Sequence, residues 1–372
     1  MKKHSKLYLL LAAVMFAACS DEDIVPDPPL HLRLSGCVSN DNADARATWT
    51  DNNSAKLTFA WDYSQPDTTD SELKMAFIKE GNCLKTTGGN RMTAARILKH
   101  SDPEKTEDKY WAAFETIEGF NPEMADSEYD GYTVYAVTPI NNVNLSTVDV
   151  NEPNGLFTAT LHMPTVFTQP EENSLTHLSN YMYMYAEGVL ANCTASLTFN
   201  HLAAYLRFKV YNWRRVPATL YGVKMEIVDA EGNTVPASGI QANYQTNGFD
   251  YTPATDGEGI QVGFADGGLT FDDKVFLYAP VFPVGTENPF QGKTLRFSLI
   301  AQDPTGVAAQ GEYEYFTYEL SGETFKNVTK SYDWTAGDLY TFHLYLDDVL
   351  KVPEVTVNDW NQTEIDGGEA EE

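Results

Sequence analysis

Residues 197–210 read LTFNHLAAYLRFKV, and their two-residue hydrophobic period is that of a β-strand. Leu197 and Phe199 alternate with polar neighbours, and a second alternating run follows. Between the two runs the phase slips at Asn200 and His201, which is typical of a kinked strand. Because this stretch lies near the middle of the chain and follows a segment rich in turn residues, we interpret it as the junction between two β-rich domains.

The length and composition are those of a globular protein. The chain has 372 residues, of which 42% are hydrophobic and 12% aromatic, enough for about two cores of ordinary size. Its formal net charge is −28, and loss of the first eighteen residues, which contribute three lysines and no acid, would make it −31. Nucleic acid and anionic lipid surfaces repel such a protein, so we expect neither as a partner. We interpret the acid excess as a solvated exterior rather than as a cation site.

The N-terminus has the parts of a bacterial export signal. Lys2, Lys3 and Lys6 precede an apolar run over residues 7–18, which is too short to span a bilayer but has the length of a signal-peptide core. Small residues stand directly before Cys19, and this arrangement resembles the lipobox of bacterial lipoproteins, in which the cysteine is acylated and becomes the first residue. We therefore expect lipidation, for example with palmitate, at Cys19. The alternative is an ordinary secretory peptide in which this cysteine falls by chance.

The residues after Cys19 indicate the compartment. The acidic run at residues 20–23 resembles the surface-export signal of Bacteroidetes lipoproteins, so the expected address is the outer face of the outer membrane. Acyl chains contribute about 0.8 kcal/mol per buried methylene, so a multiply acylated cysteine would anchor the protein stably without a membrane-spanning segment. Residues 19–29 are acidic and rich in proline, and we interpret them as an extended tether.

The first strand and the loop after it carry a candidate processing site. Leu30, Leu32 and Leu34 alternate with polar residues, which predicts a half-buried strand. The polar stretch that follows predicts a loop whose single arginine, Arg46, precedes Ala47. A trypsin-like protease can cut at an exposed arginine of this kind. Most such arginines are solvated surface residues, and that is the alternative.

Short alternating segments recur along the rest of the chain. Their spacing, with turn residues between them, favours β-sandwiches over a parallel sheet. A short helix is predicted only at residues 92–99. The main strand predictions lie at residues 75–78, 110–114, 132–137, 223–228, 275–280, 295–300, 313–318 and 340–346.

One stretch imitates the start of a calcium loop. It contains Asp126, Glu128, Asp130 and Gly131, but Val137 stands at the twelfth position, where a bidentate glutamate is required. We therefore interpret the stretch as a turn and expect no metal site there.

The sequence lacks the common signatures of an enzyme. It has no Gly-x-Ser-x-Gly, no His-Glu-x-x-His and no phosphate-binding glycine loop. We interpret His201 as a structural residue at the kink and the acid pairs at residues 272–273 and 347–348 as solvated turns. A two-carboxylate glycosidase is the remaining enzymatic alternative. We expect no enzymatic activity and no cofactor.

Five stretches, taken in order along the chain, resemble the fimbrillin family of Bacteroidetes, the type V pilins. They are Cys19 with its acidic run, residues 197–210, VFLYAPVFP at residues 275–283, AGDLYTFHL at residues 336–344 and VTVNDW at residues 355–360. The resemblance implies an all-β fold of two tandem transthyretin-like β-sandwich domains. These would span residues 30–195 and residues 196–360, after a signal peptide at residues 1–18 and before an acidic tail at residues 361–372.

The resemblance also implies assembly of a cell-surface pilus, or fimbrium, by strand exchange. An arginine-specific protease would cut between Arg46 and Ala47 and release the first strand with its lipid. The loss of Leu30, Leu32 and Leu34 would open a groove, which a strand of a neighbouring pilin subunit would fill by β-augmentation.

The candidate donor strand is the last apolar segment, residues 352–360. Its apolar positions are Val352, Val355 and Val357, of which the last two alternate as in a strand. The alternative is that this segment completes its own sandwich. Partners in the polymer would be other pilin subunits, of the same or of a different sequence.

The cysteines after the lipobox leave two readings open. Cys37, Cys83 and Cys193 are an odd number in an exported chain. Cys83 and Cys193 are the pair that would remain after the implied cut, and packed thiols are equally consistent with the sequence.

A second function class is an uncut surface lipoprotein that binds a glycan or a host protein. Its candidate residues are exposed aromatics such as Tyr181, Tyr183 and Tyr185. Alternation predicts instead that these tyrosines share one buried face of a strand, with Met182 and Met184 on the opposite face.

Overall fold

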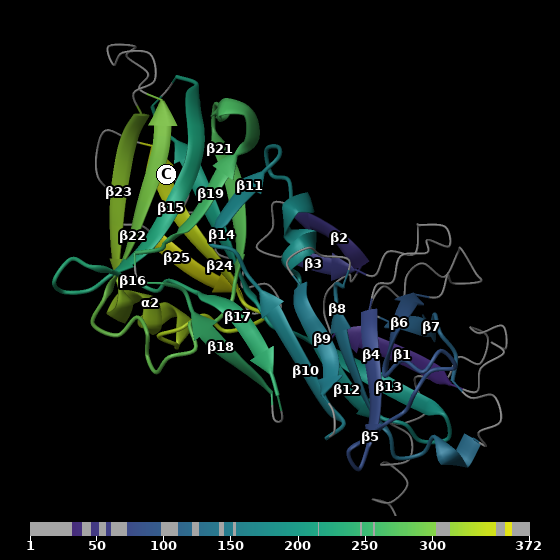
Figure 1. Ribbon diagram of the computed structural model, residues 1–372. Coiled ribbons are helices and arrows are strands. Elements are labelled where there is room, and N and C mark those ends of the chain that lie inside the picture. The colour runs from purple at the N-terminus through teal and green to yellow at the C-terminus, as the bar shows by residue number, and fades with distance from the viewer. Residues whose placement is uncertain are drawn as a thin grey trace, which may run out of the picture.

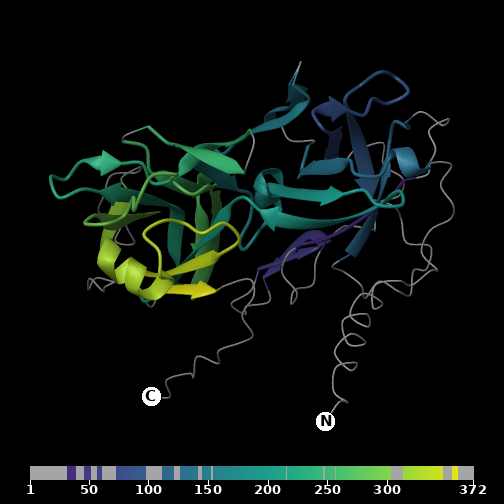
Figure 2. The same cartoon turned by 90° about the horizontal axis from the view of Figure 1, so that it is seen from below.

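The computed structural model describes residues 32–38, 46–51, 57–60, 73–97, 111–120, 126–140, 145–151, 154–214, 216–245, 248–255, 257–302, 313–346 and 354–358. These residues form two β-rich lobes, which contain mainly the first and mainly the second half of the chain (Figure 1). Seen from below, the blue strands and the green and yellow strands occupy opposite ends, with teal strands running between them (Figure 2). The fold is mostly β, as the alternating segments predict.

The first lobe is built on a sheet that closes on itself. Its strand order is β5-β4-β6-β7-β1-β13-β12-β8, and β4 pairs with β8 to close it. Inward positions are apolar at every second residue, as in β8, where Val134 and Ala136 are fully buried. The strands are β1 (Arg33–Val38), β4 (Leu73–Lys79), β5 (Asn82–Cys83), β6 (Met92–Ile97), β7 (Trp111–Thr116), β8 (Thr133–Thr138), β12 (Met184–Val189) and β13 (Thr194–His201).

The second sheet joins strands from the two halves of the chain. Its order is β18-β17-β10-β9, and β10 pairs antiparallel with β17 on one side and with β9 on the other. Figure 1 shows these strands between the two lobes. They are β9 (Leu145–Asn151), β10 (Leu156–His162), β17 (Gly239–Tyr244) and β18 (Phe249–Pro253).

Two further sheets pack against each other in the second lobe. One has the order β11-β19-β15-β22-β23, with β16 and β20 also paired to β15, and the other has the order β21-β14-β24-β25. Phe208 and Phe342 of one sheet meet Phe297 of the other, with ring centroids 6.3 and 4.7 Å away. The strands are β11 (Val166–Gln169), β14 (Ala204–Asn212), β15 (Ala218–Val228), β16 (Thr234–Val235), β19 (Ile260–Phe264), β20 (Leu269–Phe271), β21 (Lys274–Val281), β22 (Thr294–Gln302), β23 (Tyr313–Ser321), β24 (Leu339–Leu346) and β25 (Glu354–Asn358).

A hairpin and four short helices complete the described structure. The hairpin pairs β2 (Arg46–Asp51) with β3 (Leu57–Ala60) and lies beside one of these helices. The helices are the 3-10 turns η1 (Asp126–Glu128), η2 (Thr176–Tyr181) and η3 (Ala265–Gly267) and the α-helix α2 (Gly322–Thr329). Within the part of the chain that the structure describes, no helix has the length and apolar character needed to cross a membrane.

The central stretch at residues 197–210 forms two strands in different sheets. β13 belongs to the closed sheet and β14 to the second lobe, so the chain passes from one to the other here. The break falls at Leu202 and Ala203, two residues later than the slip expected at Asn200 and His201, both of which still belong to β13. The Leu202 amide donates to the Tyr183 carbonyl, so the crossing is itself held by the first lobe.

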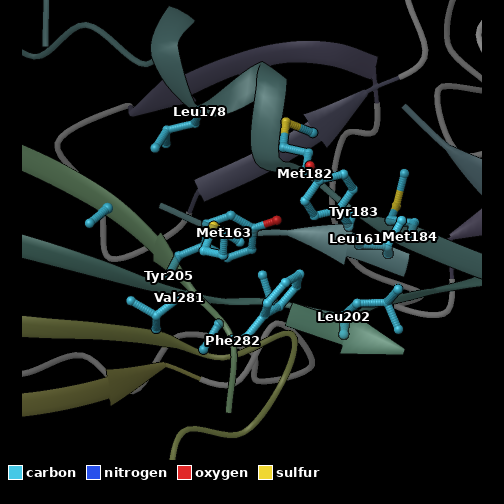
Figure 3. Packing of buried hydrophobic residues seen from close by; sticks show 14 of the residues in the cluster. Leu161, Met163, Leu178, Met182, Tyr183, Met184, Leu202, Tyr205, Val281 and Phe282 are labelled. Atoms are coloured by element: carbon cyan, nitrogen blue, oxygen red, sulfur yellow. The ribbon is translucent and has the colours of Figure 1, made fainter. Parts of the chain in front are cut away.

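The domain boundary expected between residues 195 and 196 falls inside β13. Strands β10 and β11, which precede this boundary, pair with β17 and β19, which follow it. Apolar side chains of both halves also pack together, as Figure 3 shows for Met163, Tyr183, Tyr205 and Phe282. The rings of Tyr183 and Phe282 stack with their centroids 5.7 Å apart. The two lobes therefore share buried surface.

The helix predicted at residues 92–99 is wrong for its described part, because Met92–Ile97 is strand β6. Its burial has a two-residue period, with Thr93 and Ala95 buried. The two alanines and the arginine of this segment favour a helix, but pairing with β4 on one side and β7 on the other overrides that local preference.

The helix α2 was not predicted. Its Ser321 N-cap accepts a hydrogen bond from the Thr324 amide at 3.1 Å, and it ends at Lys330, which adopts a left-handed conformation. Its one fully buried large side chain, Phe325, packs against Phe290 and Trp334. A single apolar anchor gives too weak a helical period to detect in the sequence.

Candidate functional site

Strand β1, the candidate displaced strand, lies inside the closed sheet. It pairs in parallel with β13, where Leu34 is opposite Ala195, and antiparallel with β7, where Leu34 is opposite Phe114. Leu32 and Leu34 are buried, with 8% and 4% of their surfaces exposed. The prediction that these two leucines face a core is confirmed, whereas Leu30 lies outside the described residues.

The side chains on either side of β1 meet above it. Phe114 of β7 and Phe199 of β13 form an edge-to-face pair with ring centroids 5.8 Å apart. Gly36 of β1 lies in register between their strands, opposite Ala112 and Leu197, and has no side chain to separate the rings. β1 is therefore covered by aromatic side chains from both of its neighbours, which would be left around an empty groove if it were removed.

The groove would also have open hydrogen-bonding edges. β7 and β13 each use one edge to pair with β1, so without β1 both would present unpaired N–H and C=O groups. An incoming strand that pairs with both edges and supplies an apolar side chain at every second position would satisfy these groups. The groove between β7 and β13 could therefore bind an extended strand once β1 is removed.

The expected cleavage site lies at the start of a strand, whereas the sequence predicted a loop. Arg46 and Ala47 are the first two residues of β2 rather than part of a loop, and Arg46 is in register with Ala60 of β3. The residues between β1 and β2 lie outside the described part, as does the candidate lipidation site Cys19. Cleavage and lipidation stay predictions.

Strand β25, the candidate donor, is the edge strand of its own sheet. It pairs with β24 only, with Val355 opposite Phe342 and Val357 opposite Tyr340. Val355 is 8% exposed and Val357 packs half-buried against the core, while Val352 lies outside the described residues. In this state β25 completes its own sheet, which is the alternative that the sequence left open.

The tyrosine run of the second function class is mostly internal. Tyr183 is fully buried, and its hydroxyl donates to the His162 carbonyl at 3.0 Å. Tyr185 is half-buried and its hydroxyl donates to Glu187 at 2.7 Å. The expected alternation is wrong, because Met182 and Met184 are also buried, at 3% and 1% exposure. This segment lies where the lobes share a core, so both of its faces are covered.

The other candidate residues have structural contacts. The Asp130 carboxylate accepts from the Asn192 amide at 2.6 Å, and the glycine after it has a φ of 81°, in keeping with the predicted turn. The Cys83 thiol donates to the Arg91 carbonyl at 3.0 Å, and Cys193 is buried in the core. Across the described ranges, no group of three or more His, Cys, Asp or Glu side chains is placed to hold a metal ion.

His201 is buried at the end of β13, beside the crossing between the lobes. Burial lowers its pKa to about 4, so the imidazole is neutral near pH 7. The Tyr205 hydroxyl lies 3.4 Å from its Nδ1. These contacts agree with the structural role predicted for this residue.

Comparison with known proteins identifies the family. The sequence model described as fimbrillin-like matches residues 126–360, well over half of the chain. The chain belongs to the fimbrillin-like family. The matched region contains β13, β24 and β25, and so includes one wall of the β1 groove together with the candidate donor strand.

Solved structures that match this chain include proteins from Bacteroides and Porphyromonas species. A candidate cell adhesion protein from Bacteroides uniformis has 14% identity and a TM-score of 0.46, with 89% of this chain and 98% of that chain covered. One from Bacteroides ovatus has 10% identity and a TM-score of 0.47, with 91% and 100% covered. The tip fimbrial protein Mfa3 from Porphyromonas gingivalis has 11% identity and a TM-score of 0.38, with 88% and 100% covered. A search of curated protein sequences gave no match.

Proposed function

We propose that this fimbrillin-like protein is a structural or adhesive subunit of cell-surface type V pili, assembled by protease-triggered donor-strand exchange. The observation that carries the proposal is the position of β1, paired on both sides within a closed sheet. Its removal alone would turn a closed sheet into an acceptor for an extended strand.

The acceptor groove selects for a strand with apolar residues two positions apart. Leu32 and Leu34 have this spacing, and burial of each contributes about 1.5–3 kcal/mol relative to exposure. Val355 and Val357 have the same spacing in β25. We propose residues 352–360 of a neighbouring subunit as the donor, with Val352, Val355 and Val357 as its apolar residues.

The donor is able to leave its own sheet more easily than β1 can. β25 is only five residues long and pairs on one side, whereas β1 pairs on both sides. Its departure would break one ladder, expose the edge of β24 and uncover Val355. This asymmetry favours β25 as the donor and β1 as the strand that requires a cut.

The proposed route begins with export as a lipoprotein. Acylation at Cys19 would anchor the precursor in the outer membrane through the tether at residues 19–29, and cleavage between Arg46 and Ala47 would release β1 with the lipid. Two tandem transthyretin-like sandwiches, at residues 30–195 and 196–360, are the proposed domain arrangement. Other pilin subunits are the proposed partners.

Intact-mass and N-terminal analysis of the protein recovered from the cell surface tests this route. We expect wild type to begin at Ala47 without a lipid, and Arg46→Ala to retain an acylated Cys19 and to form no polymer. Arg96→Ala is the matched control, because it removes an arginine from strand β6 of the closed sheet, away from the expected cleavage site. Polymers built from Arg46→Ala with an intact N-terminus, or wild type that begins only at Cys19, would contradict the proposal.

A further inference from the structure

The outer edge of β21 shows a feature that strand exchange at β1 does not explain. β21 is the first strand of the sheet β21-β14-β24-β25, and it pairs through one edge with β14. Along its opposite edge, every second residue turns its N–H and C=O outward. These residues include Phe276 and Tyr278, whose outward groups are hydrogen bonded by side chains rather than by another strand.

Three side chains from one short segment make these bonds. Gln169 donates from Nε2 to the Phe276 carbonyl at 2.8 Å and accepts through Oε1 from the Tyr278 amide at 3.1 Å. The Asn173 Oδ1 accepts from the Phe276 amide at 3.2 Å. The His177 Nε2 lies 2.9 Å from the Tyr278 carbonyl, and because a carbonyl can only accept, this nitrogen donates.

Gln169 acts as a single peptide group of a missing strand. Its amide has one carbonyl and one N–H donor that face the same two residues a paired strand would contact. It is fully buried, although it is the last residue of β11, which belongs to the opposite sheet of the lobe. A fully buried amide with both groups bonded to one strand edge is held there specifically.

Apolar contacts hold the rest of the segment against the lobe. Leu175 is 5% exposed and Leu178, in η2, is fully buried. Leu178 belongs to the buried cluster drawn in Figure 3, which also contains Val281 of β21. The segment is therefore anchored on both sides of His177, which lies between the two leucines.

The sequence of β21 protects the same edge at its other end. Pro280 is two residues beyond Tyr278, so it shares the outward phase of Phe276 and Tyr278, and it has no N–H to offer. Proline at such a position is a device that edge strands use against unwanted pairing. The side chains of Gln169, Asn173 and His177 cover the outward N–H and C=O groups of Phe276 and Tyr278.

We propose that Gln169, Asn173 and His177 form an edge latch that prevents β21 from pairing with β21 of a second copy of this chain. The uncovered edge is self-complementary: in an antiparallel pair centred on Leu277, Phe276 of each copy lies opposite Tyr278 of the other, and all four outward groups pair about a two-fold axis. The latch goes beyond the proposed pilus function, because it involves neither β1 nor β25.

His177 holds the η2 end of the latch. Its Nδ1 is buried and has no hydrogen-bond partner among the described residues, while Nε2 donates to Tyr278. Burial also lowers the pKa of this histidine. The imidazole is therefore neutral near pH 7, with its proton on the Nε2 that donates to Tyr278.

Gln169→Leu tests the latch directly, because leucine fills a similar volume and removes both hydrogen bonds to β21, together with one to the Glu171 carbonyl. We expect amide hydrogen exchange at Tyr278 to speed up by at least about tenfold. We also expect the variant to dimerise, by sedimentation velocity, at concentrations where wild type is monomeric. Gln261→Leu is the matched control: Gln261 is opposite Val166 in register, and alternation places it on the face away from Gln169. It should change neither measurement.

Asn173→Gly provides a second, milder variant. Asn173 is exposed with a φ of 56°, a conformation that glycine adopts readily, so only the amide that accepts from Phe276 is lost. We expect faster exchange at Phe276 and an unchanged rate at Tyr278. The two variants should therefore differ at Tyr278, whose amide exchanges faster in Gln169→Leu and at the wild-type rate in Asn173→Gly.

Two results would overturn the proposal. One is exchange that accelerates uniformly through β21 and β14, because general destabilisation rather than an opened edge would then explain both variants. The other is selective acceleration at Phe276 and Tyr278 without self-association, because the covered edge would then have no pairing to prevent. Polymerisation after cleavage at Arg46 is a separate measurement, so its failure would not count against the latch.

Discussion

The first and last described strands, β1 and β25, are held in different ways. β1 pairs with β7 and β13 inside a closed sheet, and Leu34 is buried beneath aromatic neighbours. β25 pairs with β24 alone and buries mainly Val355. An interior strand such as β1 leaves an acceptor groove only if it is removed from the sheet. An edge strand such as β25 can detach from its neighbour without any covalent change.

The largest expected effect is at β1. Leu34→Ala should lower the free energy of unfolding by about 2–5 kcal/mol, because it removes a buried side chain and leaves a cavity between β7 and β13. Urea denaturation measures this change. Val166→Ala on β11, where the valine is 60% exposed, is the control and should change stability by less than about 0.5 kcal/mol. A small effect of Leu34→Ala would remove the contrast between the two strands.

A smaller effect is expected at β25. Val355→Ala removes two methyl groups from a site at the edge of its sheet, so we expect a loss of about 1–2 kcal/mol. The amides of β25 should also exchange faster than those of β1 in wild type, because β25 can open locally. Equal protection of the two strands by amide-resolved hydrogen exchange would contradict this expectation.

Acid should weaken the hold on β25 through a histidine of the strand with which it pairs. His343 of β24 is in register with Glu354, and burial, with smaller contributions from Lys209 and Arg207, lowers its pKa to about 4. The ordinary pKa of histidine is 6.5, so the unfolded chain binds this proton more readily. The stability that neutral His343 contributes is therefore full above about pH 6.5 and is lost as the pH falls toward about 4.

The measurement is the protection of β25 amides across this pH range. We expect protection to fall with acid in wild type and to vary less in His343→Gln, which lacks the titrating ring. The sign of the trend is the test, since protection that rises on acidification would mean that a different group governs β25.

The smallest effect is expected from a charge pair near β1. Arg96 of β6 and Glu115 of β7 form a bridge of 2.7 Å, with 40% and 23% of their side-chain surfaces exposed. A partly solvated pair of this kind is worth about 0–1 kcal/mol. A double-mutant cycle of Arg96→Ala and Glu115→Ala should give a coupling in that range. A larger coupling would mean that charge, as well as apolar packing, holds the strands around β1.

Strands with a clean local period could be predicted from the sequence. Leu206 and Phe208 in β14 and Phe342 and Leu344 in β24 alternate and are fully buried, as expected. Segments whose composition conflicts with their pairing could not. Met92–Ile97 has the residues of a helix and becomes a strand only because β4 and β7 flank it, and neither neighbour can be read from the segment itself.

The candidate site could be predicted only where a local two-residue period was enough to identify it. Alternation identified Leu32 and Leu34 as buried, but it could not show that β1 lies between β7 and β13, because both partners are remote in sequence. The edge latch had one local signal, Pro280 in an otherwise apolar strand. Gln169 gave none, since a glutamine at the end of a strand has the pattern of an ordinary surface residue until its partner on β21 is known.

The parallel pairing of β1 with β13 also constrains the order in which the growing chain can fold. Arg33 is in register with Thr194, so one wall of the β1 site is made from residues synthesised long after β1 itself. Contacts this remote in sequence fold slowly, and they form only after the intervening chain is available. β1 would therefore be synthesised well before its binding partner exists, and closure of the first lobe would be a late event in the folding of the chain.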